Sequence, residues 1–425
     1  MKTLIKNGRV VDPNTKLDAV CDILIENKKI IEIKEDIPAG NTRVVDAAGL
    51  IVAPGFIDMH VHLREPGQEH KETIASGSAA AARGGFTSIA CMPNTDPVND
   101  NSGITQFIQQ QARRGSGVNV FPIAAVTLGL AGESITNMAE LLEAGAVAFS
   151  DDGHPVSSSL VMRRALEYAG GLNALIIDHC EDRELSSGGV MHEGDNSYLF
   201  GLKGIPATAE DIMVSRDILL AESSNARVHI AHVSTEGSVE LLRIAKEKNL
   251  PVTAEVTPHH LLLTDADCEQ YDTHFKVNPP LRTRKDRDAL VGAVRDGTID
   301  AFATDHAPHS QDEKAVEFDI APFGINGLET AVSLLLDKFV RTEIISLARF
   351  IEMFSTRPAQ ILGLPQKGTI QPGADADLTF LNLDKNITVN RNHFLSKSRN
   401  TPFHGWKLKG TPVMTIVGGK IVFPM

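Results

Sequence analysis

Cysteine and long apolar runs are both scarce in this 425-residue sequence. The four cysteines, Cys21, Cys91, Cys180 and Cys268, lie far apart and form no C-x-x-C pair. A disulfide framework is therefore excluded, and reduced thiols are expected. No apolar stretch approaches the roughly 18–20 residues of a membrane span. The first residues alternate like a β-strand without an apolar core, so we expect no signal peptide. Together these absences predict a cytoplasmic protein that does not cross a membrane.

Positive charge is also in deficit, with 41 Lys and Arg against 54 Asp and Glu and a formal net charge of −13. This balance argues against non-specific binding to nucleic acid. The length allows two or three domains, or one large barrel with an appendage.

The chain divides into three parts that differ in the spacing of their apolar and polar residues. Residues 1–54 and 365–425 read as short alternating strands separated by turns such as Asn7-Gly8 and Gly418-Gly419. Residues 55–364 instead alternate short apolar strands with helical patterns. We therefore expect both ends of the chain to be rich in β-strands and the middle part to fold differently.

The middle part contains eight strand candidates, which predicts an α/β fold of the (β/α)8 TIM-barrel type. An open doubly wound sheet is the alternative, but no Gly-rich phosphate loop follows the first strand. The segment 182–207 is rich in Gly and Ser and reads as an irregular loop over a site. The strand candidates are 56–62, 87–92, 119–126, 146–150, 174–179, 228–232, 252–256 and 301–304.

The first of these strands ends in two histidines, His60 and His62. Residues i and i+2 of a strand point to the same face, so both imidazoles aim at one point, as a metal ion requires. Arg64 lies two residues after His62, so it points to the same face and can hold an anionic group beside that metal. Two histidines alone are a weak signal, and their meaning depends on partners at other strand ends.

Such partners follow most of the other strands. Because the site of a (β/α)8 barrel lies at the carboxyl ends of its strands, they should meet at one rim. Imidazole nitrogens and carboxylate oxygens without a thiolate suit divalent zinc. The set exceeds what one tetrahedral zinc uses, and a carboxylate shared between two ions would account for the surplus. The candidates are His60, His62, Asn94, Asp151, Asp152, Asp178, His179, His232, Asp305 and His306.

The sequence resembles the amidohydrolase superfamily and, within it, the type I dihydroorotases. The resemblance runs essentially from end to end, and its motifs are highly specific only in combination. They are His60-Val-His62-Leu-Arg64-Glu-Pro-Gly67, Met92-Pro-Asn94-Thr, Asp151-Asp152-Gly153, Asp178-His179, Ala231-His232-Val-Ser, Val277-Asn278-Pro-Pro, Ala303-Thr304-Asp305-His306-Ala-Pro-His309 and Pro322-Phe323-Gly324. The resemblance implies that the two ends of the chain form one small β-sandwich domain beside the barrel.

The resemblance implies a metal centre of two zinc ions per subunit, with a one-zinc form as the alternative. His60, His62 and Asp305 would hold one ion, and His179 and His232 the other. Many relatives bridge the ions with a carboxylated lysine on the fourth strand. This chain has no lysine between Lys71 and Lys203, so Asp152 takes the bridging position, with Asp151 as the competing ligand.

The resemblance also implies a reaction, the reversible hydrolysis of dihydroorotate to N-carbamoyl-aspartate in pyrimidine synthesis. Asp305 would carry a proton from the attacking water to the departing ring nitrogen. Arg64, Asn94 and His309, with His62 close by, would bind the substrate carboxylate, because a guanidinium matches it in a bidentate pair. The amide groups of the ring would be bound by the remaining substrate-binding candidates, Asn278, Phe323 and Gly324.

Three other functions compete with this reading. Another cyclic amidase, such as a hydantoinase, dihydropyrimidinase or allantoinase, typically uses the lysine bridge and lacks Leu63-Arg64 with Asn94. A silent scaffold for aspartate transcarbamoylase would have lost metal ligands, and a purely structural barrel would not need Asp305 and Arg64. By resemblance we expect a homodimer, with a complex with aspartate transcarbamoylase as a further option. His259 and His260 are given no role in this set. They end the seventh strand, where a hydrogen-bond partner of a metal ligand could lie.

Overall fold

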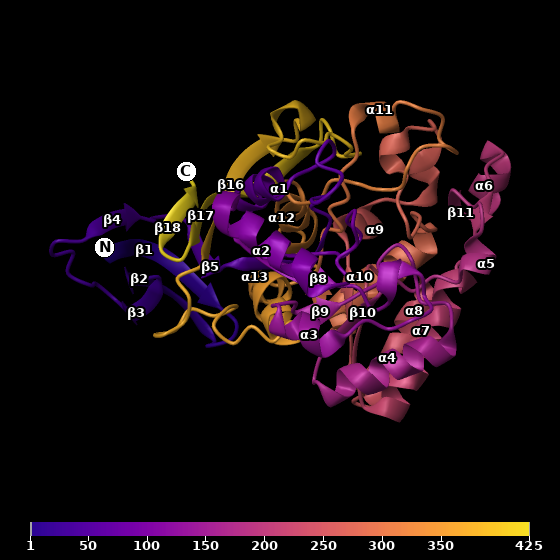
Figure 1. The fold of residues 1–425 in the computed structure, drawn as a ribbon. Helices are drawn as coiled ribbons and strands as arrows, with labels where there is room; N and C mark the ends of the chain where they lie inside the picture. The colour runs from indigo at the N-terminus through magenta and orange to yellow at the C-terminus, as the bar shows by residue number, and fades with distance from the viewer. Residues whose placement is uncertain (1, 425) are drawn as a thin grey trace.

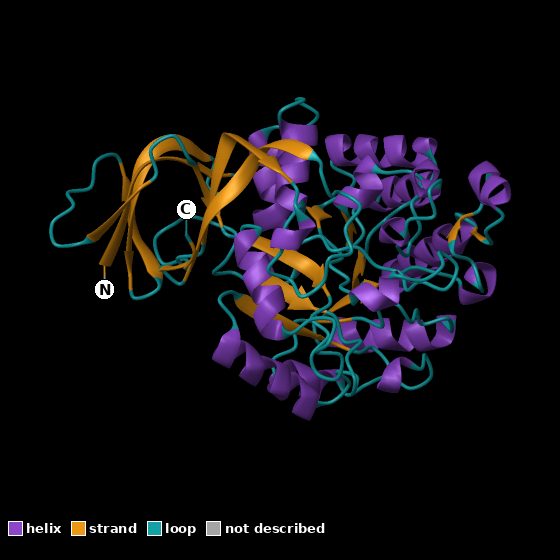
Figure 2. Ribbon diagram, turned by 90° about the horizontal axis from the view of Figure 1, so that it is seen from above, coloured by secondary structure: helices purple, strands orange, loops and turns teal. Residues whose placement is uncertain are grey.

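The computed structural model describes residues 2–424, and its larger part is a barrel of eight parallel strands ringed by helices (Figure 2). The strands follow one another around the barrel in chain order. A parallel bridge between Val61 and His306, with the amide of His62 donating to the carbonyl of His306 at 2.9 Å, joins the first strand to the last. The barrel strands are β6 (Phe56–Val61), β7 (Phe86–Cys91), β8 (Asn119–Ala124), β9 (Ala148–Phe149), β10 (Leu175–Asp178), β13 (Arg227–Ile230), β14 (Val252–Val256) and β15 (Ala301–Phe302). The predicted (β/α)8 fold is confirmed.

Helices cover the outside of the barrel, and most begin at a polar cap. Thr73, Asn101, Thr235 and Thr283 each accept a hydrogen bond from a backbone amide of the first turn that follows, which satisfies a donor that the helix leaves free. The helices are α1 (Ile74–Arg83), α2 (Ser102–Gly115), α3 (Met138–Glu143), α4 (Ser159–Gly171), α7 (Thr208–Ser224), α8 (Glu236–Glu247), α9 (Pro258–Leu262), α10 (Arg284–Asp296), α11 (Gln311–Lys314), α12 (Ala331–Leu335), α13 (Leu347–Ile351) and α14 (Arg357–Ile361). Shorter 3₁₀ and π turns are η1 (Leu128–Leu130), η2 (Asp265–Cys268), η3 (Thr273–Phe275), η4 (Leu336–Val340), η5 (Glu352–Thr356) and η6 (Arg391–His393). No helix within residues 2–424 has the length and apolar character needed to span a membrane.

The two ends of the chain share one mixed sheet, as predicted (Figure 1). Strand β5 joins them, because it pairs in parallel with β1 and antiparallel with β16. The sheet packs over its own apolar core, which includes Ile5, Ile23, Val52, Leu378 and Phe380. Its strands are β1 (Lys2–Asp12), β2 (Leu17–Glu26), β3 (Lys29–Lys34), β4 (Arg43–Asp46), β5 (Ile51–Pro54), β16 (Leu378–Thr388), β17 (Lys407–Val417) and β18 (Lys420–Phe423).

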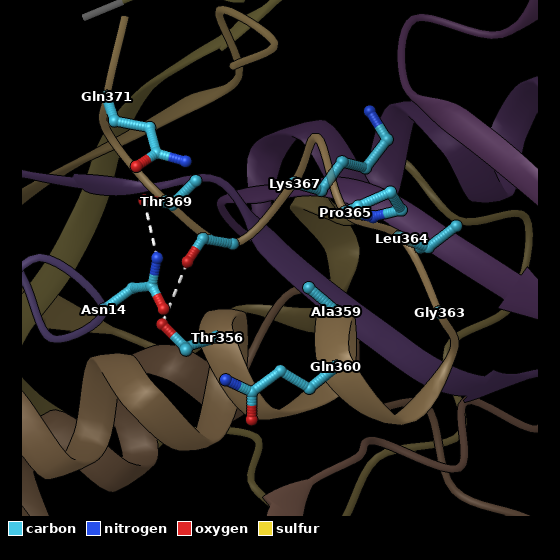
Figure 3. A pocket seen from close by; sticks show the side chains of 11 residues that line it. Asn14, Thr356, Ala359, Gln360, Gly363, Leu364, Pro365, Lys367, Thr369 and Gln371 are labelled. Carbon is cyan, nitrogen blue, oxygen red and sulfur yellow. Dashed lines mark hydrogen bonds between the residues drawn. The ribbon is translucent and has the colours of Figure 1, made fainter. Parts of the chain in front are cut away.

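The junction of the sheet with the barrel contains a cavity of about 430 Å³ (Figure 3). Two hydrogen bonds lie at its edge, from Asn14 Nδ2 to Thr369 Oγ1 at 3.0 Å and from Thr356 Oγ1 to the carbonyl of Gly368 at 2.9 Å. None of the predicted site residues lines this cavity.

The segment 182–207 differs from the irregular loop that the sequence indicates. It contains α5 (Arg183–Ser186), β11 (Met191–His192), α6 (Asp195–Phe200) and β12 (Gly204–Ile205), and β11 pairs in parallel with β12. Local signals explain this order, since Asp182 caps α5 and the left-handed Gly201 ends α6. The elements are too short for a periodic pattern to reveal them. In Figure 1 they project from the side of the barrel opposite the terminal sheet.

The connection between β16 and β17 leaves the terminal sheet and packs on the barrel. Its apolar side chains Phe394 and Phe403 share a core with Val277, Phe318 and Ile325, which belong to barrel loops. The C-terminal part of the chain therefore contributes to the barrel face as well as to the sheet.

Candidate metal centre

The six predicted metal ligands meet at the carboxyl ends of the barrel strands, and Asp152 lies at their centre. Its Oδ1 is 3.2 Å from His60 Nε2, 3.6 Å from His179 Nδ1 and 3.5 Å from His232 Nε2. Its Oδ2 is 3.4 Å from His62 Nε2. One carboxylate thus faces four imidazoles that come from three different strands.

Asp305 completes the group on the side of the first strand. Its Oδ1 lies 3.2 Å from His62 Nε2 and 3.6 Å from His60 Nε2. On the other side, His179 Nδ1 is only 2.9 Å from His232 Nε2. The six side chains therefore fall into two adjoining sets of donors that share Asp152. All are at least 95% buried.

Asp151 faces away from this cluster. Its Oδ1 accepts hydrogen bonds from the amides of Val126 and Thr127 at 2.8 and 3.0 Å, and its other oxygen accepts one from the Thr127 hydroxyl. Asp151 thus fixes the loop after β8, whereas Asp152 turns toward the histidines.

Hydrogen bonds from the outer ring nitrogens make this cluster suitable for a metal. His60 Nδ1 donates to Glu255 at 2.8 Å, and His179 Nε2 donates to Glu181 at 3.2 Å. His62 Nδ1 donates to Asn94 Oδ1 at 2.9 Å. A ring that donates from its outer nitrogen presents a lone pair at the inner one, as metal ligation requires.

The electrostatics favour a cation at the same point. His60 Nε2 and Asp152 Oδ1 are buried without a hydrogen-bond partner among residues 2–424, which buried polar atoms rarely tolerate. Burial lowers the pKa of His60, but Asp152 and Glu255 outweigh it and raise the pKa well above its ordinary value. Burial also lowers the pKa of His179, but Asp152 and Glu181 outweigh this effect and raise the pKa to about 10. The carboxylates therefore demand positive charge here, and the nitrogen and oxygen donors fit divalent zinc.

Glu255 and Glu181 are functional candidates that the sequence reasoning missed. Glu255 is fully buried and also accepts a hydrogen bond from His229 Nε2 at 3.1 Å. The sequence contains an indication of each. Glu255 is the one charged residue in the strand Val252–Val256, and Glu181 lies two residues after His179, so that both would point to the same face of an extended chain. His259 and His260 are also buried. His260 is held by Thr257 and the carbonyl of Pro279, and His259 Nε2 has no partner among residues 2–424.

Three residues of the site have a left-handed backbone. Arg64, His232 and Asp305 have φ values of 59°, 30° and 45°. Residues other than glycine rarely adopt this region, and each such residue costs on the order of 1–3 kcal/mol. Surrounding contacts must therefore hold the three residues in this conformation.

Arg64 is a buried cation without an anionic partner. The side chain is 9% exposed, and its Nε donates to the carbonyl of Pro308 at 3.3 Å. Its guanidinium forms no ion pair with any carboxylate of residues 2–424. Burial lowers its pKa to about 10, so the group stays charged at neutral pH. A buried charge is costly unless it is paired, so this arrangement suits an anionic ligand.

The other predicted substrate-binding residues surround the metal cluster. Asn94 reaches Asp152 through Nδ2, at 3.5 Å from its carbonyl. Asn278 Nδ2 donates to Glu181 at 3.1 Å and lies 3.3 Å from His179 Nε2.

His309 contacts the turn that contains Phe323 and Gly324, with its Nε2 donating to the carbonyl of Phe323 at 2.8 Å. Burial first, and then the charge of Arg64, lowers the pKa of His309 to about 2, so its ring is neutral. The amide of Gly324 already donates to the carbonyl of Lys276 at 2.9 Å.

Comparison with known proteins agrees with this geometry. Residues 49–238 match the family model described as "Dihydro-orotase-like", and residues 333–423 match the amidohydrolase family. A curated dihydroorotase from Pelotomaculum thermopropionicum is 54% identical over 422 residues, which cover 99% of this chain and 98% of the relative. Another, from Syntrophus aciditrophicus, is 52% identical over 425 residues, or 100% and 99% of the two chains. The chain belongs to the dihydroorotase family.

Solved structures of more distant relatives share the dihydroorotase-like fold of this chain. An L-hydantoinase from Arthrobacter aurescens superposes with a TM-score of 0.89 at 28% identity, covering 99% of this chain and 96% of that one. A dihydropyrimidinase from Brevibacillus agri gives 0.87 at 26% identity, covering 100% and 95%. The fold shared with these two structures therefore includes both the barrel and the terminal sheet.

Replacing Glu255 by Gln should weaken the binding of a divalent metal by about 10–100-fold, because His60 loses the carboxylate that orients it and raises its basicity. The measurement is a competition titration of the apo-protein with zinc and a chromophoric chelator. E247Q, on the exposed face of α8, is the control. Equal zinc affinity in E255Q and E247Q would show that Glu255 does not support the metal centre.

Proposed function

We propose that this chain is an enzyme that catalyses the reversible hydrolysis of dihydroorotate to N-carbamoyl-aspartate. The observation that carries the proposal is the buried, unpaired Arg64 beside a cluster of four histidines and two aspartates. The cluster suits hydrolysis of an amide, and the arginine suits a substrate with a carboxylate. The curated relatives at about half identity over the full chain carry the name dihydroorotase.

The proposed cofactor is zinc, with two ions per subunit and Asp152 between them. His60, His62 and Asp305 would hold one ion, and His179 and His232 the other. Zinc at this place would activate water near neutral pH and polarise the ring carbonyl. The hydrogen bonds of the outer ring nitrogens to Glu255, Glu181 and Asn94 direct the inner nitrogens toward the metal position and support this assignment.

Asp305 is the proposed proton carrier. Its Oδ1 lies at the edge of the cluster on the side of His62 and Arg64. Burial raises the pKa of Asp305, but His62 and His60 outweigh it and hold the pKa below its ordinary value. The carboxylate is therefore ionised and able to accept a proton from the attacking water. Returning that proton to the departing ring nitrogen completes ring opening, and the reverse transfer serves ring closure.

The substrate carboxylate is assigned to Arg64, with Asn94 and His309 beside it and His62 adjoining. The planar guanidinium can bind both carboxylate oxygens at once. Asn278 and the backbone at Phe323 and Gly324 are assigned to the ring amides. Because the amide of Gly324 is already used by Lys276, the Phe323 amide is the proposed donor at this turn.

Hydantoinase or dihydropyrimidinase activity is the second candidate, since solved structures with those names superpose closely. Their identity to this chain is 26–28%, against 52–54% for the curated dihydroorotases. Asp152 also stands where the lysine bridge is expected in those enzymes. A silent scaffold is disfavoured because all six predicted ligands are present and converge.

We further propose a cytoplasmic homodimer, which in some settings associates with aspartate transcarbamoylase. The four buried free cysteines fit a reducing compartment. The association rests on the family resemblance.

Offering purified protein dihydroorotate, hydantoin, dihydrouracil and allantoin tests the proposal directly. Dihydroorotate should be the preferred substrate, and a chelator should abolish its turnover until zinc is restored. Preference for a substrate without a carboxylate would refute the assignment. Turnover that survives metal removal would refute the metal mechanism.

Asp305→Asn should lower kcat by about 10²–10⁴-fold, because the amide cannot accept the proton. Steady-state kinetics with dihydroorotate, together with circular dichroism, measures the effect on the folded protein. D312N, at an exposed carboxylate of α11, should behave as wild type. A D305N enzyme with near-normal kcat would remove Asp305 from the proton pathway.

Arg64→Ala should raise KM for dihydroorotate by about 10–100-fold, since hydrogen bonds to a charged group are lost from a buried site. R64K keeps the charge but not the planar fork, so it should recover only part of the affinity. Zinc content, measured by atomic emission, should be unchanged in both. Zinc loss in step with activity would instead make Arg64 a structural residue.

A further inference from the structure

Three consecutive backbone carbonyls of the turn at Phe323 are each held by a different side chain. Lys314 Nζ donates to the carbonyl of Pro322 at 2.7 Å, and His309 Nε2 donates to that of Phe323 at 2.8 Å. Asn400 Nδ2 donates to that of Gly324 at 3.0 Å. A turn fixed at three successive peptide groups cannot shift without breaking buried hydrogen bonds.

Asn400 also binds the segment that contains His309. Its Nδ2 donates to the carbonyl of Ala307 at 2.9 Å, and its Oδ1 accepts from the amide of His309 at 3.3 Å. These two groups flank Pro308, whose carbonyl accepts the hydrogen bond from Arg64 Nε. The side chain is 2% exposed, so one buried amide joins residues 307–309 to Gly324.

At Gly324 there is no free space between these two segments. Its φ is +147°, and a Cβ added there would lie 2.6 Å from the carbonyl oxygen of Ala307. The two backbones are thus in direct contact where Asn400 joins them. A small displacement of either segment would move Phe323 relative to Arg64 and His309.

Asn400 comes from the connection between β16 and β17 and not from the barrel. The strap, defined as residues 396–400, is fixed to the barrel at its other end. Ser396 donates through its hydroxyl to the buried Glu72, and Ser398 Oγ donates to the carbonyl of Lys71 at 2.9 Å. Glu72 in turn accepts from His306 Nε2 at 3.3 Å. The strap therefore contacts the loops after the first and the last barrel strands.

We propose that Asn400 is a positioning residue for the substrate, which sets the spacing between the Phe323–Gly324 turn and the pair formed by Arg64 and His309. The C-terminal strap then completes the part of the site that binds the anionic ring. The inference rests on the proposed function, because it assigns substrate contacts to these groups. Asn400 itself touches neither the metal cluster nor a reacting atom.

Asn400→Ala tests this role by removing both donated hydrogen bonds and the accepted one. KM for dihydroorotate should rise by about 10-fold or more, because buried groups lose their partners and the turn loses its fixed position. The value of kcat should change by less than about 3-fold, and zinc content should stay at the wild-type level, since the ligands lie outside the contacts of Asn400. A rise in KM without a loss of zinc is the signature of positioning.

N400D separates hydrogen bonding from volume, because it keeps the shape and the acceptor for His309 but loses both donors. It should raise KM at least as much as N400A. N392A, at an exposed position of the same connection, should match wild type. Melting temperatures are recorded for every variant, and N400D decides the question if N400A does not fold.

The outcomes distinguish the two proposals. A wild-type protein that does not turn over dihydroorotate refutes the proposed function. If wild type is active, an unchanged KM in N400A or N400D overturns the role of Asn400. A parallel loss of zinc and kcat at constant KM also overturns it, because Asn400 would then be structural.

Discussion

Closure of the barrel between its first and last strands is the constraint on which the site depends. The hydrogen bond from His62 to the carbonyl of His306, at 2.9 Å, joins residues that are far apart in the chain. It places Asp305 against His62 and His60, which no local structure could do. An open sheet with the same strands would leave Asp305 at one edge and the two histidines at the other. The closed geometry thus converts scattered side chains into one cluster.

The cluster concentrates buried charge, and its neighbours compensate for that cost. Asp152 faces four imidazoles, while Glu255 and Glu181 fix two of these rings from behind. Such a network is stable only when each charge has a partner. Arg64 is an exception at the edge of this network, because its guanidinium forms no ion pair with a carboxylate of residues 2–424. The site thus combines satisfied charges around the metal position with one cation kept available for a ligand.

The sequence predicts the barrel well because each strand is a short apolar run that ends in a polar residue. His60, His62, Asp152 and Asp305 lie at such ends, where one rim of the barrel collects them. Asn400 is different, since it lies 91 residues from His309 in a connection without a periodic pattern. Its role depends on a tertiary contact that neither spacing nor composition encodes. The short helices and strands of 182–207 are not predicted for a related reason, because elements of this length are too short to show a periodic pattern of apolar residues.

Strand β5 has a consequence for the order in which the chain can complete its fold. It lies between β1 and β16, and Phe56 just after it bonds with Thr379, 323 residues further along the chain. During synthesis, one edge of β5 therefore stays unpaired until nearly the whole chain has left the ribosome. An exposed strand edge is a template for association with other chains. The nascent protein must keep that edge protected for most of its own translation.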